Sequence, residues 1–169
     1  SLLSTPISLF VCHGQAQRVV SKWIKQELTL GQKIQHQNLQ IIPIPFVSQD
    51  DYDWLLARCD LNIVRGEDSF VRAQWAQAPF IWQIYPQSDN AHIIKLEAFL
   101  EKYLSGVDQT TVEGVNALMH WNPPQEWLNS LQSLKSHAVH WKKRLLSLNH
   151  DGDLAEKLRK FIETHANGK

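Results

Sequence analysis

The sequence predicts an α/β protein, in which a parallel sheet is covered by helices on both faces and an all-helical tail follows. Two observations predict this fold class. Up to residue 86, short apolar runs alternate with stretches of helical periodicity, and such a β-α-β-α-β-α-β order is typical of parallel sheets. After residue 90 only helical periodicity remains. A chain of 169 residues fits one domain and can bury roughly 70% of its unfolded surface.

The first strand and helix are predicted from an apolar run and the periodic stretch behind it. Residues 7–12 (ISLFVC) form a short apolar run that predicts a strand, and His13-Gly14 turns the chain after it. Residues 16–28 place apolar side chains at helical spacing. Residues 30–37 are polar and are predicted to be a loop.

The second strand is predicted over residues 39–46 (LQIIPIPF), which are rich in isoleucine. Pro43 and Pro45 donate no ladder hydrogen bond, so we expect an edge or an end of the strand there. Residues 48–51 (SQDD) predict a helix start, because they combine a polar cap with acidic residues in the first turn. The apolar face of that helix is expected to carry Tyr52, Leu55, Leu56 and Cys59.

The stretch from Cys59 to Pro86 reads as strand, charged loop, helix and strand. Residues 61–64 (LNIV) predict a buried strand, and residues 65–69 (RGEDS) predict a compact polar loop. Residues 70–77 have nearly helical spacing, and residues 80–85 (FIWQIY) predict a second strand between two prolines. In such units, ligands collect at the carboxyl ends of the strands.

The second half of the chain predicts four amphipathic helices that pack over the sheet, at residues 92–104, 110–121, 124–148 and 154–165. Pro123-Pro124 and Asp151-Gly152 are expected to separate the last three of them. The third is expected to turn inward Trp127, Leu128, Leu131, Leu134, Ala138, Trp141 and Leu145. The last is expected to turn inward Leu154, Leu158, Phe161 and Ile162.

Composition and charge narrow the class of protein. The net charge is +0 and the pI is about 7.1, which argues against a nucleic-acid-binding face over the whole domain. Cys12 and Cys59 have no metal or disulfide spacing, which favours a reducing cytoplasm. No apolar run approaches the ~18 residues of a membrane span, and no signal peptide is recognisable. Because residue 1 is Ser and the only Met is Met119, we expect a piece of a longer or processed protein.

The RGEDS loop is the first candidate site. It lies between a predicted strand end and a helix start, where unpaired N–H groups and the helix dipole suit an anion such as a diphosphate. Arg65 and Ser69 have the side chains for that role. The structural alternative is a salt bridge from Arg65 to Glu67 or Asp68, with Asp68 or Ser69 capping the helix.

Aromatic side chains near the same predicted sheet edge are the second candidate. Phe46 and Tyr52 flank the helix start at residues 48–51 and can sandwich a planar base. The alternative is ordinary core for Phe46 and a packed helix face for Tyr52. Tyr85 ends a predicted strand on the same side, where its phenol either donates to a phosphate oxygen or simply lies at the rim.

Other motifs in the sequence give weaker evidence for a functional site. His137 and His140 are three residues apart on a predicted helix, but no Cys, Asp or Glu lies within a turn to complete a metal site. We therefore expect them to flank a packing stripe and predict no metal. The glycine-rich fingerprints GxGxxG and GxxxxGK[ST] are absent, and no Ser-His-Asp order can be argued.

The stretch from Ile44 to Tyr103 resembles the C-terminal domain of the bacterial elongation factor P arginine rhamnosyltransferases. The most specific part is NIVRGEDSFVRAQWA, and weaker similarity continues to the end of the chain. At the front, ISLFVCHGQAQRVVSKWI looks like the second strand-loop-helix unit of that domain. Where the family usually reads Pro-Glu-Gly, this chain reads Cys12-His13-Gly14, which puts a ligand contact from that loop in doubt.

The resemblance implies a fold and an activity. Members have two Rossmann-like domains that face a cleft, the GT-B arrangement, and residues 1–169 would be the donor-binding C-terminal one, truncated at its front. That domain holds dTDP-β-L-rhamnose, and no cofactor is expected. The N-terminal domain, expected to be absent here, docks elongation factor P and supplies the catalytic aspartate. Rhamnose is transferred with inversion to an arginine of the factor.

The resemblance also implies roles for individual residues. Phe46 and Tyr52 would stack on the thymine, with Gln49 in the loop between them. The diphosphate and the rhamnose would be held by Arg65, Asp68, Ser69 and Tyr85. Glu67 matches a glutamate that the family needs for activity, either to orient the donor or to help at the reacting centre.

Two other functions stay open at this point. The chain can be the donor-binding domain of another GT-B glycosyltransferase, which a preference for UDP over dTDP would reveal. It can also be a non-enzymatic α/β interaction domain, in which RGEDS is only a cap and a salt bridge. In either enzymatic case, this fragment alone is expected to be inactive. The protein is expected in the cytoplasm, with neither a membrane nor a nucleic acid as partner.

Overall fold

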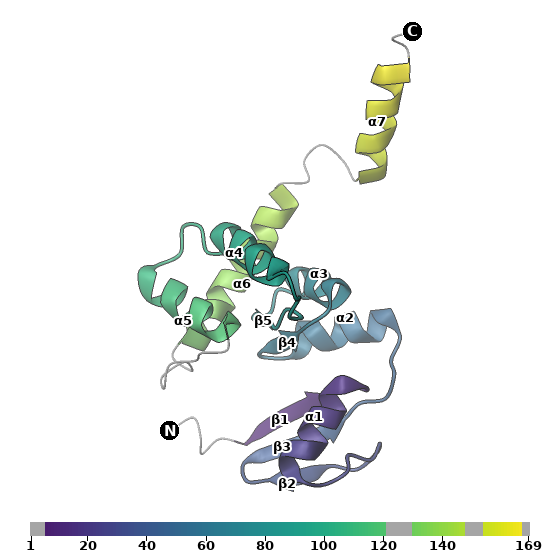
Figure 1. The fold of residues 1–169 in the computed structure, drawn as a ribbon, viewed down its shortest axis with the longest axis vertical. Coiled ribbons are helices and arrows are strands. Elements are labelled where there is room, and N and C mark those ends of the chain that lie inside the picture. The colour runs from purple at the N-terminus through teal and green to yellow at the C-terminus, as the bar shows by residue number, and fades with distance from the viewer. Residues whose placement is uncertain (1–5, 121–129, 148–153, 167–169) are drawn as a thin grey trace. The chain divides into compact units, whose positions relative to one another are not determined.

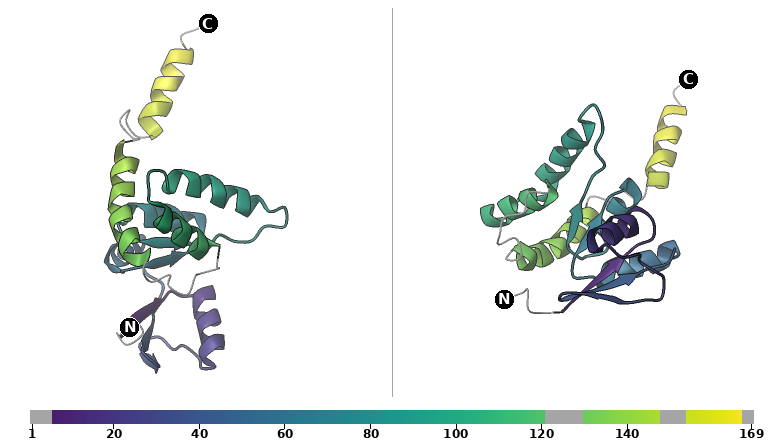
Figure 2. Two further views of the ribbon diagram at one scale, coloured as in Figure 1. Left: turned by 90° about the vertical axis from the view of Figure 1, so that its left-hand side faces the viewer. Right: turned by 60° about the horizontal axis from the view of Figure 1, so that its bottom comes forward.

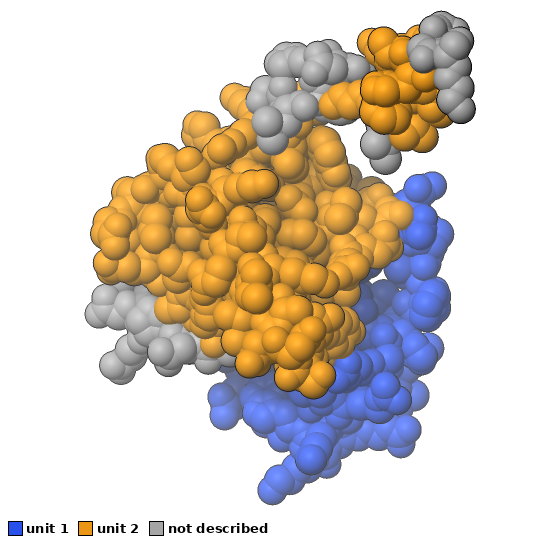
Figure 3. All heavy atoms as spheres, turned by 45° about the horizontal axis from the view of Figure 1, so that its top comes forward, with its two compact units in different colours: residues 1–52 blue, residues 53–169 orange. Residues whose placement is uncertain are grey.

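The computed structural model describes residues 6–120, 130–147 and 154–166, and shows a mixed α/β fold. The chain divides into two compact units, Ser1–Tyr52 and Asp53–Lys169, which Figure 3 colours blue and orange. In chain order the elements (Figure 1) are β1 Ile7–Val11, α1 Gln15–Ile24, β2 Ile34–His36, β3 Leu39–Pro43, α2 Gln49–Arg58, β4 Asn62–Val64, α3 Glu67–Trp75, β5 Phe80–Trp82, α4 Ala91–Tyr103, α5 Gln109–Met119, α6 Ser130–Ser147 and α7 Leu154–Ala166.

The first unit contains a three-stranded sheet in the order β1-β3-β2. β1 and β3 run parallel, as predicted, with Ile7 opposite Leu39. β2 runs antiparallel to β3, so the prediction of a loop over residues 30–37 is wrong for Ile34–His36. α1 lies beside the sheet (Figure 2), and the buried core consists of Val11, Leu28, Ile34 and Ile41.

Local backbone geometry decides where the helix and the strand of this unit end. α1 stops at Ile24, short of the predicted residue 28, because Lys25 takes the left-handed conformation (φ 56°) and its N–H bonds to the Ser21 carbonyl. Leu28 then enters the core from outside the helix. β3 ends at Pro43, which confirms the expected strand end.

The start of α2 also agrees with the sequence. The Asp51 N–H donates to Ser48 Oγ at 3.1 Å, and Ser48 Oγ donates to the Asp51 carboxylate at 2.6 Å. The first of these bonds satisfies one free backbone donor of the first turn, and the second holds the Ser48 hydroxyl in place. The boundary between the two units falls inside this helix, after Tyr52.

The second unit is built on β4 and β5, which pair in parallel with Asn62 opposite Phe80. Among the described residues the strands thus form two separate sheets, and not the single parallel sheet that was predicted. The run LNIV is also not buried throughout, because Ile63 is 55% exposed whereas Asn62 and Val64 are 6% and 3% exposed. Asn62 is accommodated inside because its Nδ2 donates to the Leu56 carbonyl at 2.9 Å.

The helices α4, α5 and α6 belong to this unit and cover it, as the sequence predicts. α5 packs on β5, and α6 packs on α3 and α5. An aromatic cluster joins these elements and consists of Phe70, Phe80, Trp82, Phe99, Tyr103 and Trp141. Trp141 also donates from Nε1 to Gln74 Oε1 at 3.2 Å, which fixes α6 against α3.

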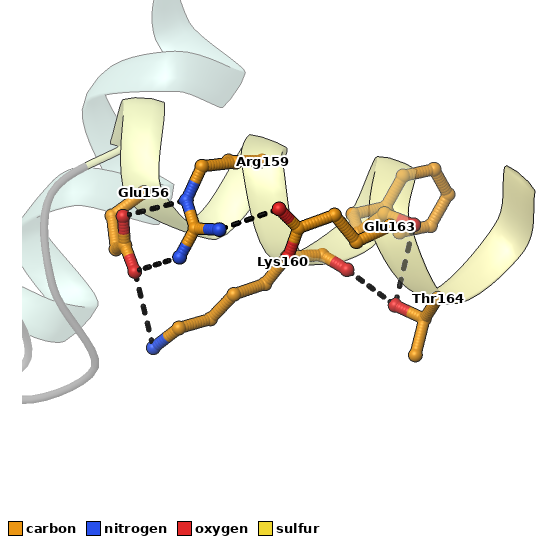
Figure 4. Close-up of polar contacts among 6 residues, drawn as sticks. Glu156, Arg159, Lys160, Glu163 and Thr164 are labelled. Carbon is orange, nitrogen blue, oxygen red and sulfur yellow. Dashed lines mark hydrogen bonds and ion pairs between the residues drawn. The ribbon is translucent and has the colours of Figure 1, made fainter.

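The last helix differs from the prediction. Leu158, Phe161 and Ile162 are 56%, 59% and 56% exposed, so the apolar face of α7 is not turned inward. Ion pairs run along the helix instead: Arg159 bonds to Glu156 and Glu163, as Figure 4 shows.

Several predictions lie outside the described residues. They concern Pro123-Pro124, the start of the third helix with Trp127 and Leu128, and Asp151-Gly152. Within the described ranges, none of the helices is both long enough and apolar enough to cross a membrane.

Candidate anion site and base-contacting residues

The candidate anion site lies where β4 passes into α3. Arg65 follows β4 directly, and the helix begins at Glu67, three residues earlier than the sequence predicted. Gly66 is the N-cap and has no side chain to satisfy the first N–H groups. The Arg65 backbone is held by the Trp82 indole, whose Nε1 donates to the Arg65 carbonyl at 3.1 Å. The helix therefore presents open donors next to a fixed arginine.

The Arg65 side chain lies over an aromatic ring. Its Cζ is 4.4 Å from the centroid of the Tyr85 ring, which comes from the segment after β5. Because β4 and β5 are parallel, the chain leaves both strands at the same edge, and Tyr85 lies on the same side as the RGEDS loop, as predicted. β5 itself ends at Trp82, so Tyr85 lies beyond the strand in which the sequence placed it.

The alternative interpretation of Arg65, a salt bridge to Glu67 or Asp68, is wrong, because both carboxylates pair with other residues. Glu67 pairs with Lys95 (Nζ to Oε1, 3.3 Å), and Asp68 pairs with Arg72 (Nε to Oδ2, 3.4 Å). Arg65 Nε is buried and has no hydrogen-bond partner among the described residues. A buried guanidinium N–H without an acceptor costs free energy, so this group is suited to donate a hydrogen bond to an oxygen of a ligand.

A cavity of about 210 Å³ opens beside Arg65. Its walls include Arg65, Glu67, Trp82, Tyr85, Gln87 and Lys95. The sequence reasoning missed Gln87 and Lys95, because they come from the next segment and from α4 and share no motif with RGEDS. Lys95 adds a second cation to the cavity.

Asp68 and Ser69 occupy the first turn of α3 but do not line that cavity. Ser69 Oγ donates to the Gly66 carbonyl at 2.8 Å. The Asp68 side chain is 79% exposed and shares Arg72 with Asp53, whose Oδ2 lies 2.7 Å from Arg72 Nη1. The hydrogen bond that Arg72 donates to Asp53, and then the one it donates to Asp68, raise the pKa of Arg72.

The predicted base-contacting residues belong to the first unit. Phe46 is 89% exposed, so the core alternative for it is wrong. Its ring meets the edge of His13 with centroids 6.1 Å apart, because both residues follow the parallel strands β3 and β1. Gln49 is the first residue of α2 and is exposed, and Tyr52 is half-buried further along the same helix.

The other groups considered in the sequence lie elsewhere. His137 is packed edge-on against Tyr103, with ring centroids 4.5 Å apart, and His140 is exposed on α6. In the parts of the chain that the structure describes, no three His, Cys, Asp or Glu side chains come together as metal ligands would. Burial raises the pKa of the Cys12 thiol, which keeps it protonated.

Comparison with known proteins decides the family. The model described as "Elongation-Factor P (EF-P) rhamnosyltransferase EarP" matches residues 2–163. The chain belongs to this family. The resemblance found in the sequence is therefore confirmed.

Individual proteins similar to this chain support the same family. The chain is 39% identical over 140 residues to a protein-arginine rhamnosyltransferase of Pseudomonas aeruginosa, covering 82% of this chain and 37% of that protein. It is 42% identical over 148 residues to the protein of the same name from Pseudomonas putida, covering 82% and 39%. The chain thus spans well under half the length of these relatives.

A solved structure is also similar. It comes from work on the "structural basis for EarP-mediated arginine glycosylation of translation elongation factor EF-P". It superposes with a TM-score of 0.80 at 34% sequence identity, over 95% of this chain and 53% of that one.

Proposed function

We propose that this chain is the donor-binding part of a protein-arginine rhamnosyltransferase, which transfers rhamnose from dTDP-β-L-rhamnose with inversion to an arginine of translation elongation factor P. One observation carries the proposal. Arg65 presents a buried nitrogen without a partner among the described residues, next to the open N-terminus of α3 and in a cavity that also holds Lys95.

The charges of this cavity suit a diphosphate. Arg65 and Lys95 contribute two positive charges and Glu67 one negative charge, and the positive end of α3 points to the same place. As the bond to the sugar breaks, negative charge grows on the leaving dTDP. Arg65 and the helix N–H groups stabilise that charge, which lowers the barrier.

Glu67 has a positioning role in this proposal. Its carboxylate is held by Lys95 at 3.3 Å and lies on the cavity wall beside Arg65. It accepts a hydrogen bond from a sugar hydroxyl and so orients the donor. Asp68 and Ser69 lie one step further along the first turn and contact the donor at the diphosphate and the rhamnose.

The proposed thymine contacts are Phe46, Gln49 and Tyr52. The support for Phe46 is its exposure, since an 89% exposed phenylalanine gains from stacking on a planar base. Gln49 offers an amide that matches the polar edge of a pyrimidine.

The fold proposed for the complete enzyme is GT-B, with this chain as its Rossmann-like C-terminal half. The support is the coverage, because the similar solved chain is about twice as long as the matched part. The remaining half then docks the factor and supplies the catalytic aspartate. That group has a demanding task, since a guanidinium stays protonated in water and is a poor nucleophile until prepared. A cytoplasmic location follows from such an acceptor.

The test is calorimetric titration of the full-length protein with dTDP and with UDP. Arg65→Ala is expected to weaken dTDP binding by at least ~1.5 kcal/mol, about tenfold, because a charge-assisted hydrogen bond is lost. Arg58→Ala is the matched control: this arginine lies over Trp54 (3.9 Å to the ring centroid) and not in the cavity. Equal dTDP affinity in both variants would reject the role of Arg65.

The same titration separates the two alternatives. Preference for UDP over dTDP would select a different GT-B glycosyltransferase. Absence of binding to either nucleotide by the folded full-length protein would select a non-enzymatic interaction domain.

A further inference from the structure

A second cavity lies among the helices of the second unit. Its volume is about 470 Å³, within the range that small organic ligands occupy. Its lining residues come from the end of α4, the start of α5 and the middle of α6, and none of them lines the cavity beside Arg65. Its walls include Tyr103, Asp108, Thr111, His137, Trp141 and Arg144.

Two buried polar atoms on these walls have no partner among the described residues, the Tyr103 hydroxyl and His137 Nε2. Tyr103 is 0% exposed, and its ring contacts His137 with centroids 4.5 Å apart. Leaving such groups unsatisfied costs free energy, whereas ligand oxygens can accept from the Tyr103 hydroxyl and, once the ring is protonated, from His137 Nε2. The burial that raises the pKa of Tyr103 also keeps its hydroxyl a donor.

The charged groups around the cavity favour an anion. Arg144 donates from Nη1 to the Lys102 carbonyl at 3.1 Å, which holds a positive charge at the wall. His140 lies one turn before it on α6 and also lines the cavity. The opposing charge is Asp108, but both of its oxygens are engaged by Thr111, at 3.0 Å from the backbone N–H and 2.7 Å from Oγ1. Those hydrogen bonds lower the Asp108 pKa and direct its charge to the start of α5.

We propose that this cavity is a second binding site, which takes the phosphate group of a small molecule. Phosphate oxygens accept from the Tyr103 hydroxyl, from Arg144 and from a protonated His137. The remainder of the ligand contacts the apolar wall that Trp141 and Val107 provide. A tetrahedral anion with several acceptor oxygens matches this spread of donors better than a single planar carboxylate does.

Binding should be coupled to protonation of His137. Burial lowers the pKa of His137, a hydrogen bond to the Tyr103 backbone opposes this, and nearby His140 and Arg144 add to the lowering. The imidazole is therefore neutral at neutral pH while the cavity is empty. A bound dianion favours the protonated ring, so the affinity for phosphate should rise as the pH falls.

The test is nuclear magnetic resonance of the full-length protein with isotope-labelled histidine, titrated with inorganic phosphate and, at matched ionic strength, with sodium chloride. An Arg65→Ala background removes the first anion site. The His137 and His140 resonances are expected to shift saturably with phosphate only. Arg144→Gln should weaken this binding at least about tenfold, because a charge-assisted hydrogen bond is lost.

The matched control is Arg159→Gln, which removes an equal charge from α7, outside the cavity. Its phosphate affinity should stay within about twofold of the background. Tyr103→Phe keeps the ring and loses only the donor, so it provides a second test if Arg144→Gln does not fold, with an expected loss of about fivefold. Unmoved His137 and His140 resonances, or equal effects of Arg144→Gln and Arg159→Gln, would overturn the proposal.

Discussion

Replacing Tyr103 by Phe should make the protein more stable in the absence of phosphate. Tyr103 is completely buried, and its hydroxyl has no hydrogen-bond partner among the described residues. On unfolding that hydroxyl regains its bonds to water, which favours the unfolded state of the wild type. Phenylalanine removes this penalty while the ring stays in place.

The size of the effect follows from these contacts. Leaving a buried polar group unsatisfied costs ~1–3 kcal/mol. The ring contacts with Phe99, Trp141 and Phe80, at centroid distances of 5.0, 5.2 and 5.3 Å, do not depend on the hydroxyl. We expect the free energy of unfolding to rise by ~1–2 kcal/mol, where each kcal/mol corresponds to a rise in Tm of roughly 2–4 °C for a chain of this size.

The assay is urea unfolding followed by tryptophan fluorescence, first without phosphate and then with it. Phosphate should stabilise the wild type more than Tyr103→Phe, because binding to the native state alone stabilises it and the variant binds less tightly. The advantage of the variant should therefore shrink as phosphate is added. A variant that is less stable than the wild type in phosphate-free buffer would refute the reasoning, since it would show that the hydroxyl has a partner.

Three further outcomes are expected. Asn62→Leu leaves the Leu56 carbonyl without its buried donor, so unfolding in urea should show a loss of ~1–3 kcal/mol; an unchanged midpoint would contradict this. Asp108→Ala removes the cap bond to the Thr111 N–H and should lower Tm, whereas Asp108→Asn, which keeps an acceptor oxygen, should restore most of it. Because the pKa of His137 is lower in the folded than in the unfolded protein, where it is near 6.5, its contribution to stability is present above that pH and lost below it. His137→Gln should therefore reduce the drop in unfolding free energy between about pH 8 and about pH 5.5, and an equal drop in both proteins would contradict the assignment.

The sequence predicts strands and helices well where local signals decide them. The start of α2 at Ser48 and the end of β3 at Pro43 both depend on side chains within a few residues. β2 was missed because Ile34–His36 is short and polar in composition, and only its pairing with β3 makes it a strand. Ile63 shows the limit of apolarity as a signal, since the alternation along β4 turns it outward and the buried place goes to Asn62.

In the candidate site, too, the features set by local sequence could be predicted and those set by distant parts of the chain could not. The meeting of Arg65 and Tyr85 could be predicted, because both follow parallel strands. The partner of Glu67 could not, since Lys95 reaches it from a helix 28 positions later in the chain. Nor could the exposure of Leu158 on α7 be predicted, because its helical spacing is the same whether the face is covered or not.

The aromatic cluster has a consequence for how this family can vary. Phe99 contacts five other rings, those of Phe70, Phe80, Trp82, Tyr103 and Trp141. A change of volume at Phe99 therefore disturbs α3, β5 and α6 at once, and no single neighbour can refill the space. We therefore expect a change of ring size at one of these positions to be tolerated only when a neighbouring ring changes size to compensate. Since Trp82 also donates to the Arg65 carbonyl, such a change in the aromatic cluster is expected to move Arg65 as well.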